Sequence, residues 1–282
     1  MTGATTAVDW EARLAAAGLL SPTDLLPNAD LRRFAGQWEA LVKPGLGGRE
    51  RWRWQPEGTD ATLYLKRYVH TPWGEQLDRI RRQASRHSRA WWEYHQSREL
   101  ARRYIPAVRA VAVAEEMHSL IEKHSVVLFE AVAGDALDRV WPELERAGAA
   151  IARSPARQAI VRALARFVSA FHQTGVCHRD LYLCHIFADL DPDALRPPRF
   201  TLIDLARTHR PRWRRTRWII KDLAQLDCSA RQIGISQADR FRFLVAYLGL
   251  DSRAPRVRYY ARRVNRKSTR ILRRIARKSG SS

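Results

Sequence analysis

His178-Arg179-Asp180-Leu181 and Leu202-Ile203-Asp204-Leu205 are the two stretches that decide the fold, and their aspartates lie 24 residues apart. The first follows a helical apolar pattern and is expected in a loop, whereas the second ends an expected strand over residues 200–203. Phosphoryl transfer needs such a pair of carboxylates. One orients the attacking hydroxyl and accepts its proton, and the other holds magnesium on the nucleotide phosphates. Because this reaction depends on positioning and charge neutralisation, the two stretches favour a phosphotransferase.

A lysine and a glutamate in the first half of the chain complete this pattern. Lys66 lies in the apolar stretch Leu63-Tyr64-Leu65-Lys66 of an expected strand and resembles the strand lysine of kinases. Its partner should be a glutamate on the helix expected over residues 85–104. Glu93 lies on the apolar, inward face of that helix, whereas Glu99 lies on the polar face with Arg103 as its expected partner. We therefore expect an ion pair between Lys66 and Glu93.

Length and charge narrow the class of protein further. The chain has 282 residues, with 50 Lys+Arg against 29 Asp+Glu and a net charge of +21. Its 45% hydrophobic content excludes a disordered chain, and its apolar runs are too short for a membrane-spanning helix. Asp9 and Glu11 argue against a secretory signal, and three irregularly spaced cysteines argue against a disulfide framework. The charge predicts an anionic partner. The chain has only six lysines against 44 arginines, so each lysine is a candidate for a role that arginine cannot fill.

The order of expected elements predicts an α+β, two-lobed protein-kinase-like fold with a small β-rich N-lobe and a larger helical C-lobe. Gly134 interrupts the strand pattern, which places the lobe boundary near residues 129–135. The expected parts are an N-terminal extension of short helices (1–50), the N-lobe (51–130), the C-lobe (131–251) and a basic tail (252–282).

Several short motifs together resemble one kinase family. They are His178 to Ile186, Leu202 to Leu205, Arg217-Trp218, Lys221-Asp222-Leu223-Ala224 and Ser229-Ala230. This set resembles the bacterial lipopolysaccharide kinases of the Kdo/WaaP type, over roughly residues 50–235. The resemblance implies an ATP-dependent kinase that phosphorylates a sugar hydroxyl of the lipopolysaccharide inner core or its precursor. It also implies a cytoplasmic protein, peripheral at the inner face of the inner membrane.

The resemblance also assigns roles to individual residues. Asp180 would be the catalytic base, Asp204 the magnesium ligand, Lys66 the phosphate-binding lysine and Glu93 its partner. The loop that begins with His178-Arg179-Asp180-Leu181 would be the catalytic loop. It would be supported by His178 and by Asp222, which would hydrogen-bond the loop backbone. Glu130 would lie near the adenine of ATP.

Two departures from the general kinase pattern affect these roles. His185 stands where kinases place a magnesium-binding Asn, and imidazole is a poor magnesium ligand, so His185 is expected to be structural or to contact phosphate. Gly45, Gly47 and Gly48 precede the expected strands but do not form G-x-G-x-x-G. The loop that covers the phosphates is therefore not identified.

Two basic segments are candidates for binding anions. Six arginines fall within residues 207–217, and Arg207, Arg212, Arg214 and Arg215 are the expected acceptor-binding residues, since guanidinium groups match carboxylates and phosphates. The tail from Ser252 holds 12 Lys+Arg and no acid, with an apolar stripe that includes Val257 and Ile271. A basic amphipathic helix is typical of membrane-surface binding, and a solvated or RNA-adhering tail is the alternative.

Other functions remain open on the sequence alone. A kinase of the same fold could act on a protein or a small molecule, and only the family resemblance favours a sugar. A pseudokinase binding module is disfavoured by the intact Lys66, Asp180 and Asp204. No motif supports specific nucleic-acid binding, which is suggested by charge alone.

Overall fold

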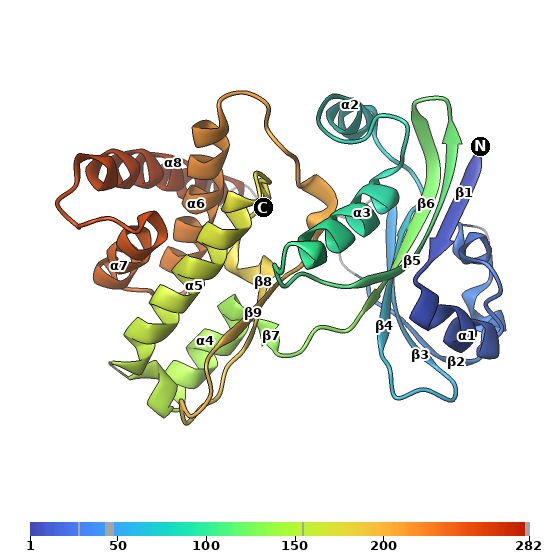
Figure 1. Cartoon of the computed structure of the whole chain (residues 1–282), viewed down its shortest axis with the longest axis horizontal. Helices are drawn as coiled ribbons and strands as arrows, with labels where there is room; N and C mark the ends of the chain where they lie inside the picture. The colour runs from blue at the N-terminus through green and yellow to red at the C-terminus, as the bar shows by residue number, and fades with distance from the viewer. Residues whose placement is uncertain (28, 43–47, 154, 280–282) are drawn as a thin grey trace. The chain divides into compact units, whose positions relative to one another are not determined.

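A six-stranded antiparallel sheet organises the first part of the chain (Figure 1), among the residues described in the computed structural model: 1–27, 29–42, 48–153 and 155–279. Its order is β1-β5-β6-β4-β3-β2. The strands are β1 (Thr2–Thr6), β2 (Gly36–Ala40), β3 (Arg49–Pro56), β4 (Leu63–Tyr68), β5 (Ala110–His118) and β6 (Ile121–Glu130). Contacts divide the chain into a first unit, Met1–Ala131 with Asp204–Ala206, and a second unit, Val132–Ile203 with Arg207–Ser282.

Helices cover both faces of the first unit's sheet. They are α1 (Val8–Ala16), α2 (Trp73–Arg82) and α3 (Arg89–Arg102), with 3-10 turns at Pro22–Leu25 and Leu31–Arg33. Side chains alternate along β4, so Leu63 and Leu65 enter the core that includes Trp10 of α1. Lys66 and Tyr68 lie on the opposite face, which α3 covers (Figure 1).

The N-terminal segment, expected as an extension of short helices, is part of this sheet. β1 pairs with β5 along its whole length, and β2 pairs with β3. Nearly all residues of the Thr2–Thr6 strand are exposed, and they lack the alternation of apolar and polar residues that indicates a strand. The sequence pattern therefore did not reveal it. The prediction that residues 1–50 stand apart from the N-lobe is therefore corrected.

The second unit is mainly helical. Its helices are α4 (Leu137–Arg146), α5 (Ala156–Gln173), α6 (Arg215–Gln232), α7 (Gln237–Leu248) and α8 (Pro255–Ser279). Its sheet has the order β7-β8-β9, from β7 (Asp135–Ala136), β8 (Ile186–Asp189) and β9 (Arg199–Leu202), and 3-10 turns lie at Ala150–Ala152, Leu183–His185 and Leu205–Arg207. The expected amphipathic helix before the catalytic loop is α5, whose buried stripe includes Ile160, Leu164 and Phe171.

Gly134 lies just after the division between the units and cannot be replaced without strain. Its φ is +78°, and an added Cβ would lie 2.2 Å from the carbonyl oxygen of Ala188. A residue other than glycine would meet both the left-handed backbone and the neighbouring strand β8. The glycine that interrupts the strand pattern is thus required by the start of the second unit's sheet.

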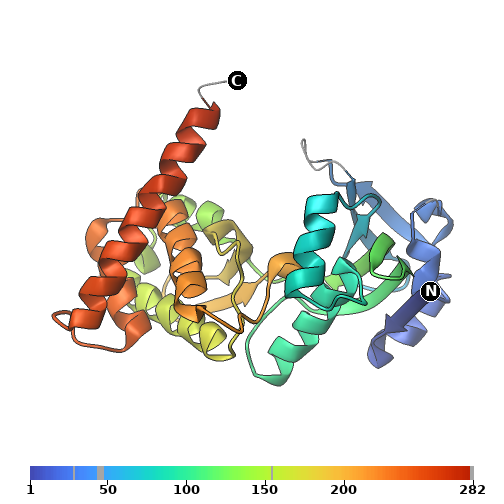
Figure 2. The ribbon, with the colours of Figure 1, turned by 90° about the horizontal axis from the view of Figure 1, so that it is seen from above.

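The basic tail is a long helix that packs on its own unit. In α8, Val257, Tyr260, Val264 and Ser268 are buried, and the helix lies along α6. The apolar stripe expected to face a membrane is therefore covered by protein over its first half. Figure 2 shows the C-terminal end of α8 extending past the neighbouring helices. Among the described residues, no helix is long and apolar enough to cross a membrane.

Candidate active site

Lys66 lies at the centre of a buried ionic cluster in the first unit. Its Nζ is 2.9 Å from Oε1 of Glu93 and 2.9 Å from Oδ1 of Asp204. The side chains of Lys66 and Glu93 are 9% and 1% exposed, so both charges are held away from water. Glu99 forms an ion pair with Arg102, and the charges of both Arg102 and the expected Arg103 lower the pKa of its carboxyl. The structure thus brings Lys66 together with Glu93, the glutamate selected by its helix face.

The charges around Lys66 fix its protonation. Burial alone would lower the pKa of Lys66, but the carboxylates of Asp204 and Glu93 raise it above its ordinary value. Tyr68 donates a hydrogen bond from its hydroxyl to Oε1 of Glu93, and burial, together with Glu93, raises the pKa of that phenol. The ammonium of Lys66 therefore stays charged across the physiological range. It is suited to bind phosphate oxygens.

Asp204 has the geometry of a residue placed for a ligand. It follows β9 with a left-handed φ of +55°, and the next turn is anchored where Ala206 accepts a hydrogen bond from Gln83 Nε2 at 2.7 Å. Its side chain is 30% exposed. A carboxylate with this access fits magnesium, which binds proteins through one or two carboxylates and completes its shell with phosphates and water.

Asp222 of α6 holds the backbone of the catalytic loop. Its Oδ2 accepts from the backbone N–H of His178 at 2.7 Å, and its Oδ1 accepts from the N–H of Arg179 at 2.8 Å. Burial would raise the pKa of Asp222, but hydrogen bonds from His172 and from the His178 backbone hold it below its usual range. The contact expected for Asp222 is present.

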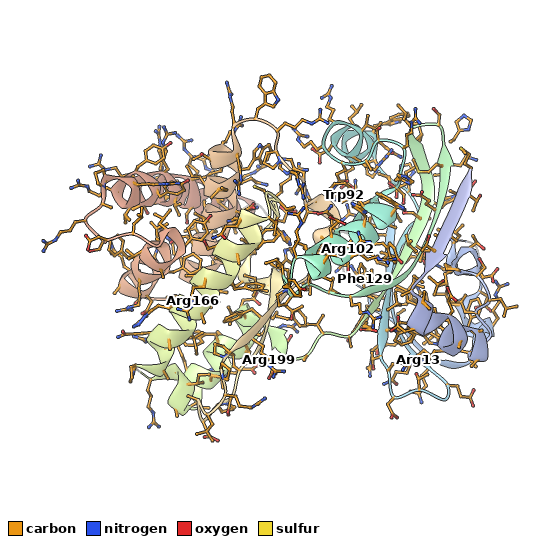
Figure 3. All side chains as sticks on the ribbon, viewed as in Figure 1. Arg13, Trp92, Arg102, Phe129, Arg166 and Arg199 are labelled. Carbon is orange, nitrogen blue, oxygen red and sulfur yellow. The ribbon has the colours of Figure 1, made fainter. Side chains whose placement is uncertain are left out.

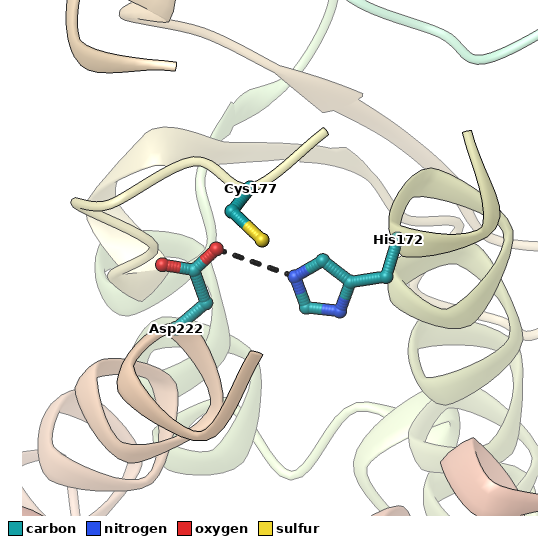
Figure 4. Close-up of side chains that lie close together, drawn as sticks. All are labelled: His172, Cys177 and Asp222. Carbon is teal, nitrogen blue, oxygen red and sulfur yellow. Dashed lines mark hydrogen bonds and ion pairs between the residues drawn. The ribbon is translucent and has the colours of Figure 1, made fainter. Parts of the chain in front are cut away.

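A buried trio of possible metal ligands lies behind this loop. His172, Cys177 and Asp222 present ligand atoms within 4.8 Å of one another, and Figure 4 shows the 3.3 Å contact between His172 Nε2 and Asp222. Burial raises the pKa of the Cys177 thiol, so it is protonated, and both oxygens of Asp222 already accept loop hydrogen bonds. His172 Nδ1 also contacts the Tyr247 hydroxyl. The trio therefore supports the loop and does not fit a metal.

The catalytic loop also depends on two further histidines. His185 Nδ1 lies 2.7 Å from the carbonyl oxygen of Asp180, and His178 Nε2 lies 3.0 Å from the carbonyl oxygen of Ile203. These contacts connect the loop to itself and to the end of β9. The ring of His185 thus holds the backbone of Asp180, as expected of a structural residue, and contact with phosphate stays a prediction.

The carboxylate of Asp180 is paired with an arginine of the loop that follows Asp204. Arg207 places one guanidinium nitrogen 2.9 Å from Oδ2 and 3.1 Å from Oδ1, and Gln225 Nε2 lies 3.4 Å from Oδ1. Both partners belong to the second unit. Arg207, expected to bind the acceptor, therefore contacts the candidate base directly, a pairing that the sequence pattern did not reveal.

The three other arginines expected to bind the acceptor differ in their backbone and in their contacts. Arg212 and Arg214 are exposed, and Arg214 has a left-handed φ of +55° at the N-terminus of α6. Arg215 is also exposed, and its guanidinium donates a hydrogen bond to the backbone oxygen of His172 at the end of α5. One nitrogen of its guanidinium thus contacts a helix end, and the binding of the acceptor by Arg215 stays a prediction.

The side chain of Glu130 links distant parts of the first unit. Its Oε1 accepts from Trp10 Nε1 at 2.5 Å and from Arg109 at 2.6 Å, and its backbone N–H donates to the Arg109 oxygen. These contacts tie α1 to the end of the sheet. The side chain of Glu130 is therefore a structural link, and the position of this residue near the adenine of ATP stays a prediction.

Lys221 is a site residue that sequence reasoning quoted in a motif but assigned no role. Its Nζ donates to the carbonyl oxygen of Arg179, beside the candidate base. Burial lowers the pKa of Lys221 to about 8, with Asp180 opposing and Arg207 reinforcing this shift. The scarcity of lysine was the signal that could have found it.

The glycines before the sheet do not identify a phosphate-covering loop. Gly45 and Gly47 lie outside the described residues. Gly48 has a φ of +76°, and a Cβ there would lie 2.3 Å from the carbonyl oxygen of His70. Its close packing against His70 accounts for this glycine without a nucleotide.

Comparisons with known proteins identify the family of this chain. A model of the lipopolysaccharide kinase (Kdo/WaaP) family matches residues 48–247. The lipopolysaccharide core heptose(I) kinase WaaP of Pseudomonas aeruginosa is 30% identical over 210 residues, covering 72% of this chain and 74% of that protein. The protein of the same name from Escherichia coli K12 is 33% identical over 101 residues, 34% of this chain and 37% of its own length.

A solved structure gives the corresponding comparison of folds. The structure of WaaP in complex with acyl carrier protein is similar to this chain with a TM-score of 0.58 and 26% sequence identity. The match covers 82% of this chain and 89% of that chain. The α+β, protein-kinase-like fold expected from the sequence is confirmed.

Proposed function

Since the chain belongs to the lipopolysaccharide kinase (Kdo/WaaP) family, we propose that it transfers the γ-phosphoryl group of ATP to a heptose hydroxyl of the lipopolysaccharide core. The observation that carries this proposal is the buried Lys66–Glu93–Asp204 cluster, together with a catalytic loop that presents Asp180. The heptose comes from the names of the relatives from Pseudomonas and Escherichia.

Each charged residue has a distinct task in this reaction. Lys66, oriented by Glu93, binds the phosphates of ATP as a compact point charge. Asp180 orients the acceptor hydroxyl and takes its proton. The acceptor oxygen forms a bond to the γ-phosphorus while the bond to the β–γ bridging oxygen breaks, and ADP leaves. Asp222 keeps the loop in place through the N–H groups of His178 and Arg179.

Asp204 is the proposed magnesium ligand. Magnesium bound there neutralises charge on the β- and γ-phosphates of ATP. His185 contributes no ligand in this proposal, because its Nδ1 holds the Asp180 carbonyl. A single carboxylate with phosphate and water ligands satisfies the usual preferences of this ion.

The test is an assay of phosphate transfer from labelled ATP to three acceptor classes. These are deacylated core oligosaccharide, a general protein substrate and free small sugars. We expect transfer to the core oligosaccharide that disappears without magnesium and in Asp180→Asn. Transfer to protein alone would favour the alternative kinase, and nucleotide binding without any transfer would favour a pseudokinase.

We also propose an acyl carrier protein as a partner, because the second unit contains an apolar cavity of about 600 Å³. Its lining includes Leu164, Leu226 and Phe243, with Arg231 and Arg240 also at the site. A cavity of this size and polarity suits an acyl chain. WaaP was solved in complex with acyl carrier protein, which supports the same partner for this chain.

Binding of acylated and unacylated carrier protein, measured by calorimetry, tests this partner. We expect the acylated form to bind more tightly, and Leu164→Trp to remove the difference by filling the cavity. Equal binding of both forms would exclude the cavity as the acyl site. Thermal unfolding of Leu164→Trp provides the control for its folding.

The remaining proposal places the protein at the cytoplasmic face of the inner membrane. Basic residues continue beyond the packed half of α8, where Ile275 is exposed. Anionic lipid attracts each Lys or Arg near a membrane surface by about 1 kcal/mol. Sedimentation with phosphatidylglycerol vesicles should exceed that with phosphatidylcholine vesicles, and neutralising Arg270, Arg273, Arg274 and Arg277 should remove the excess. Equal sedimentation with both lipids would contradict this location.

A further inference from the structure

The contact between Arg207 and Asp180 restricts the residue proposed as the catalytic base. One nitrogen of the Arg207 guanidinium contacts both carboxylate oxygens of Asp180, and Gln225 contacts one of them. A carboxylate that accepts a charged hydrogen bond directs its lone pairs toward the donor. The acceptor hydroxyl must therefore compete with Arg207 for Asp180.

The side chain of Arg207 can move while its backbone stays in place. The Arg207 carbonyl accepts from Arg179 at 3.5 Å, and two residues later His209 pairs with Cys177 through N–H···O contacts of 2.9 and 3.0 Å. The Arg207 side chain is 50% exposed, whereas that of Asp180 is 24% exposed. An exposed ion pair of this kind contributes little free energy, so a competing anion can separate it.

We propose that Arg207 restrains Asp180 until an anionic group of the acceptor draws the guanidinium away. The enzyme thereby selects acceptors whose reacting hydroxyl lies beside a carboxylate or a phosphate. This inference rests on the proposed function, because it takes Asp180 as the base. Guanidinium forms paired hydrogen bonds with either group, so the chemistry recognised is an oxyanion next to the hydroxyl.

The exchange links recognition to proton transfer. When the acceptor oxyanion binds Arg207, the Asp180 carboxylate is free to accept the proton of the neighbouring hydroxyl. The hydroxyl oxygen, as it loses this proton to Asp180, attacks the γ-phosphorus, and the β–γ bridging oxygen leaves with ADP. Without an anionic acceptor, Arg207 stays on Asp180 and water is a poor substitute for the hydroxyl. The contact thus limits wasteful hydrolysis of ATP.

Kinetics of Arg207→Gln and Arg207→Lys, with Arg199→Gln as the matched control, test the proposal. Arg199 is an exposed arginine of β9 labelled in Figure 3, and no acceptor role is assigned to it. The acceptors are deacylated core oligosaccharide, the same material with its carboxylates reduced to alcohols, and the same material after phosphatase treatment. ATP hydrolysis without acceptor is measured in parallel.

In Arg207→Gln we expect acceptor-free hydrolysis to rise about two- to fivefold, the range set by an exposed ion pair. The kcat/KM for intact oligosaccharide should fall about 10- to 100-fold, the range set by a hydrogen bond to a charged group. Wild type should discriminate against one of the two treated acceptors, which identifies carboxylate or phosphate, and Arg207→Gln should lose that discrimination. For Arg207→Lys, the hydrolysis rate, the kcat/KM and the discrimination should lie between those of wild type and those of Arg207→Gln.

Three results would overturn the inference. The first is an Arg207→Gln variant that matches Arg199→Gln in ATP hydrolysis and in acceptor selectivity. The second is an Arg207→Gln variant that keeps the wild-type preference for the intact acceptor. The third is a wild-type enzyme that phosphorylates the carboxylate-reduced and the phosphatase-treated acceptors as well as the intact one. Full activity of Asp180→Asn would instead overturn the proposed base, so the two failures can be told apart.

Discussion

Nζ of Lys66 lies 2.9 Å from Oδ1 of Asp204, although 138 residues separate them in the chain. Glu93 contacts the same nitrogen at the same distance. A strand, a helix and the segment just after β9 therefore contribute side chains to one ionic cluster. Two carboxylates thus set the position of this nitrogen, and in the proposed complex the phosphates of ATP would share it with them.

Lys66→Arg should fail to support activity despite the abundance of arginine in this chain. The planar guanidinium is longer than the ammonium and cannot occupy a point between Glu93 and Asp204. We expect kcat/KM for ATP to fall at least about tenfold, equivalent to about 1.4 kcal/mol of transition-state stabilisation. Near-normal kinetics with ATP would place the nucleotide elsewhere.

Asp180→Asn should separate catalysis from nucleotide binding. An amide cannot accept the hydroxyl proton, and general-base catalysis contributes about 10²- to 10⁴-fold, so kcat should fall by that factor. ATP affinity, measured by calorimetry, should change little, because Lys66 and Asp204 bind the phosphates in this proposal. A large loss of ATP affinity with kcat preserved would contradict the assignment.

Lys221 should produce an alkaline limb in the pH profile. Burial lowers its pKa to about 8, so the ammonium beside Asp180 loses its proton as the pH rises through that value. Its electrostatic support of the anionic site is then lost, and kcat should decline above pH 8. Lys221→Met should show a low kcat without this limb, whereas exposed Lys123→Met should keep it. A limb that persists in Lys221→Met would have another origin.

Asp222→Ala should destabilise the second unit. The substitution leaves the buried N–H groups of His178 and Arg179 without their acceptor, and each unsatisfied group costs about 1–3 kcal/mol. Thermal unfolding should therefore occur at a lower temperature, with a smaller decrease in Asp222→Asn, whose amide oxygen still accepts one bond. A melting temperature equal to that of wild type in the alanine variant would show that the loop is held by other contacts.

The double variant Arg212→Gln/Arg214→Asn should raise the KM for the acceptor several-fold and leave the KM for ATP nearly unchanged. Asn is chosen at position 214 because it tolerates the left-handed backbone there. Acceptor binding should weaken as salt rises, since exposed charges are screened over about 8 Å at physiological ionic strength. Arg199→Gln serves as the charge control. A defect confined to ATP would move this loop to the nucleotide.

The sequence was sufficient to predict the residues whose role follows from local context. Glu93 could be distinguished from Glu99 because a helix has a buried face and an exposed face, and burial of Glu93 agrees with that reasoning. Asp222 could be assigned through its motif. The positions of both residues follow from nearby sequence: a helical face for Glu93 and a short motif for Asp222.

Other features depend on contacts that no local pattern contains. Arg207 belongs to a run of similar arginines, and nothing in the run indicates that it alone reaches Asp180. The stripe in α8 looks the same whether protein or lipid covers it, and here Val257 and Tyr260 pack against protein. The contacts of the Glu130 side chain with Trp10 and Arg109 likewise join distant parts of the sequence.

The unequal packing of α8 has a consequence for proteolysis. The helix offers trypsin many arginines, but cleavage needs a segment that can unfold locally into an extended form. Val257, Tyr260 and Val264 are buried, and Arg231 of α6 contacts Asn265 at 2.5 Å and Thr269 at 3.5 Å, so unfolding there breaks the contacts with α6. Cuts should therefore begin beyond Ser268, where side chains are mostly exposed or half-buried, and leave a folded product. Removal of residues 252–282 would expose the face of α6 that α8 covers, so the packed part of the basic helix is needed for the stability of the second unit.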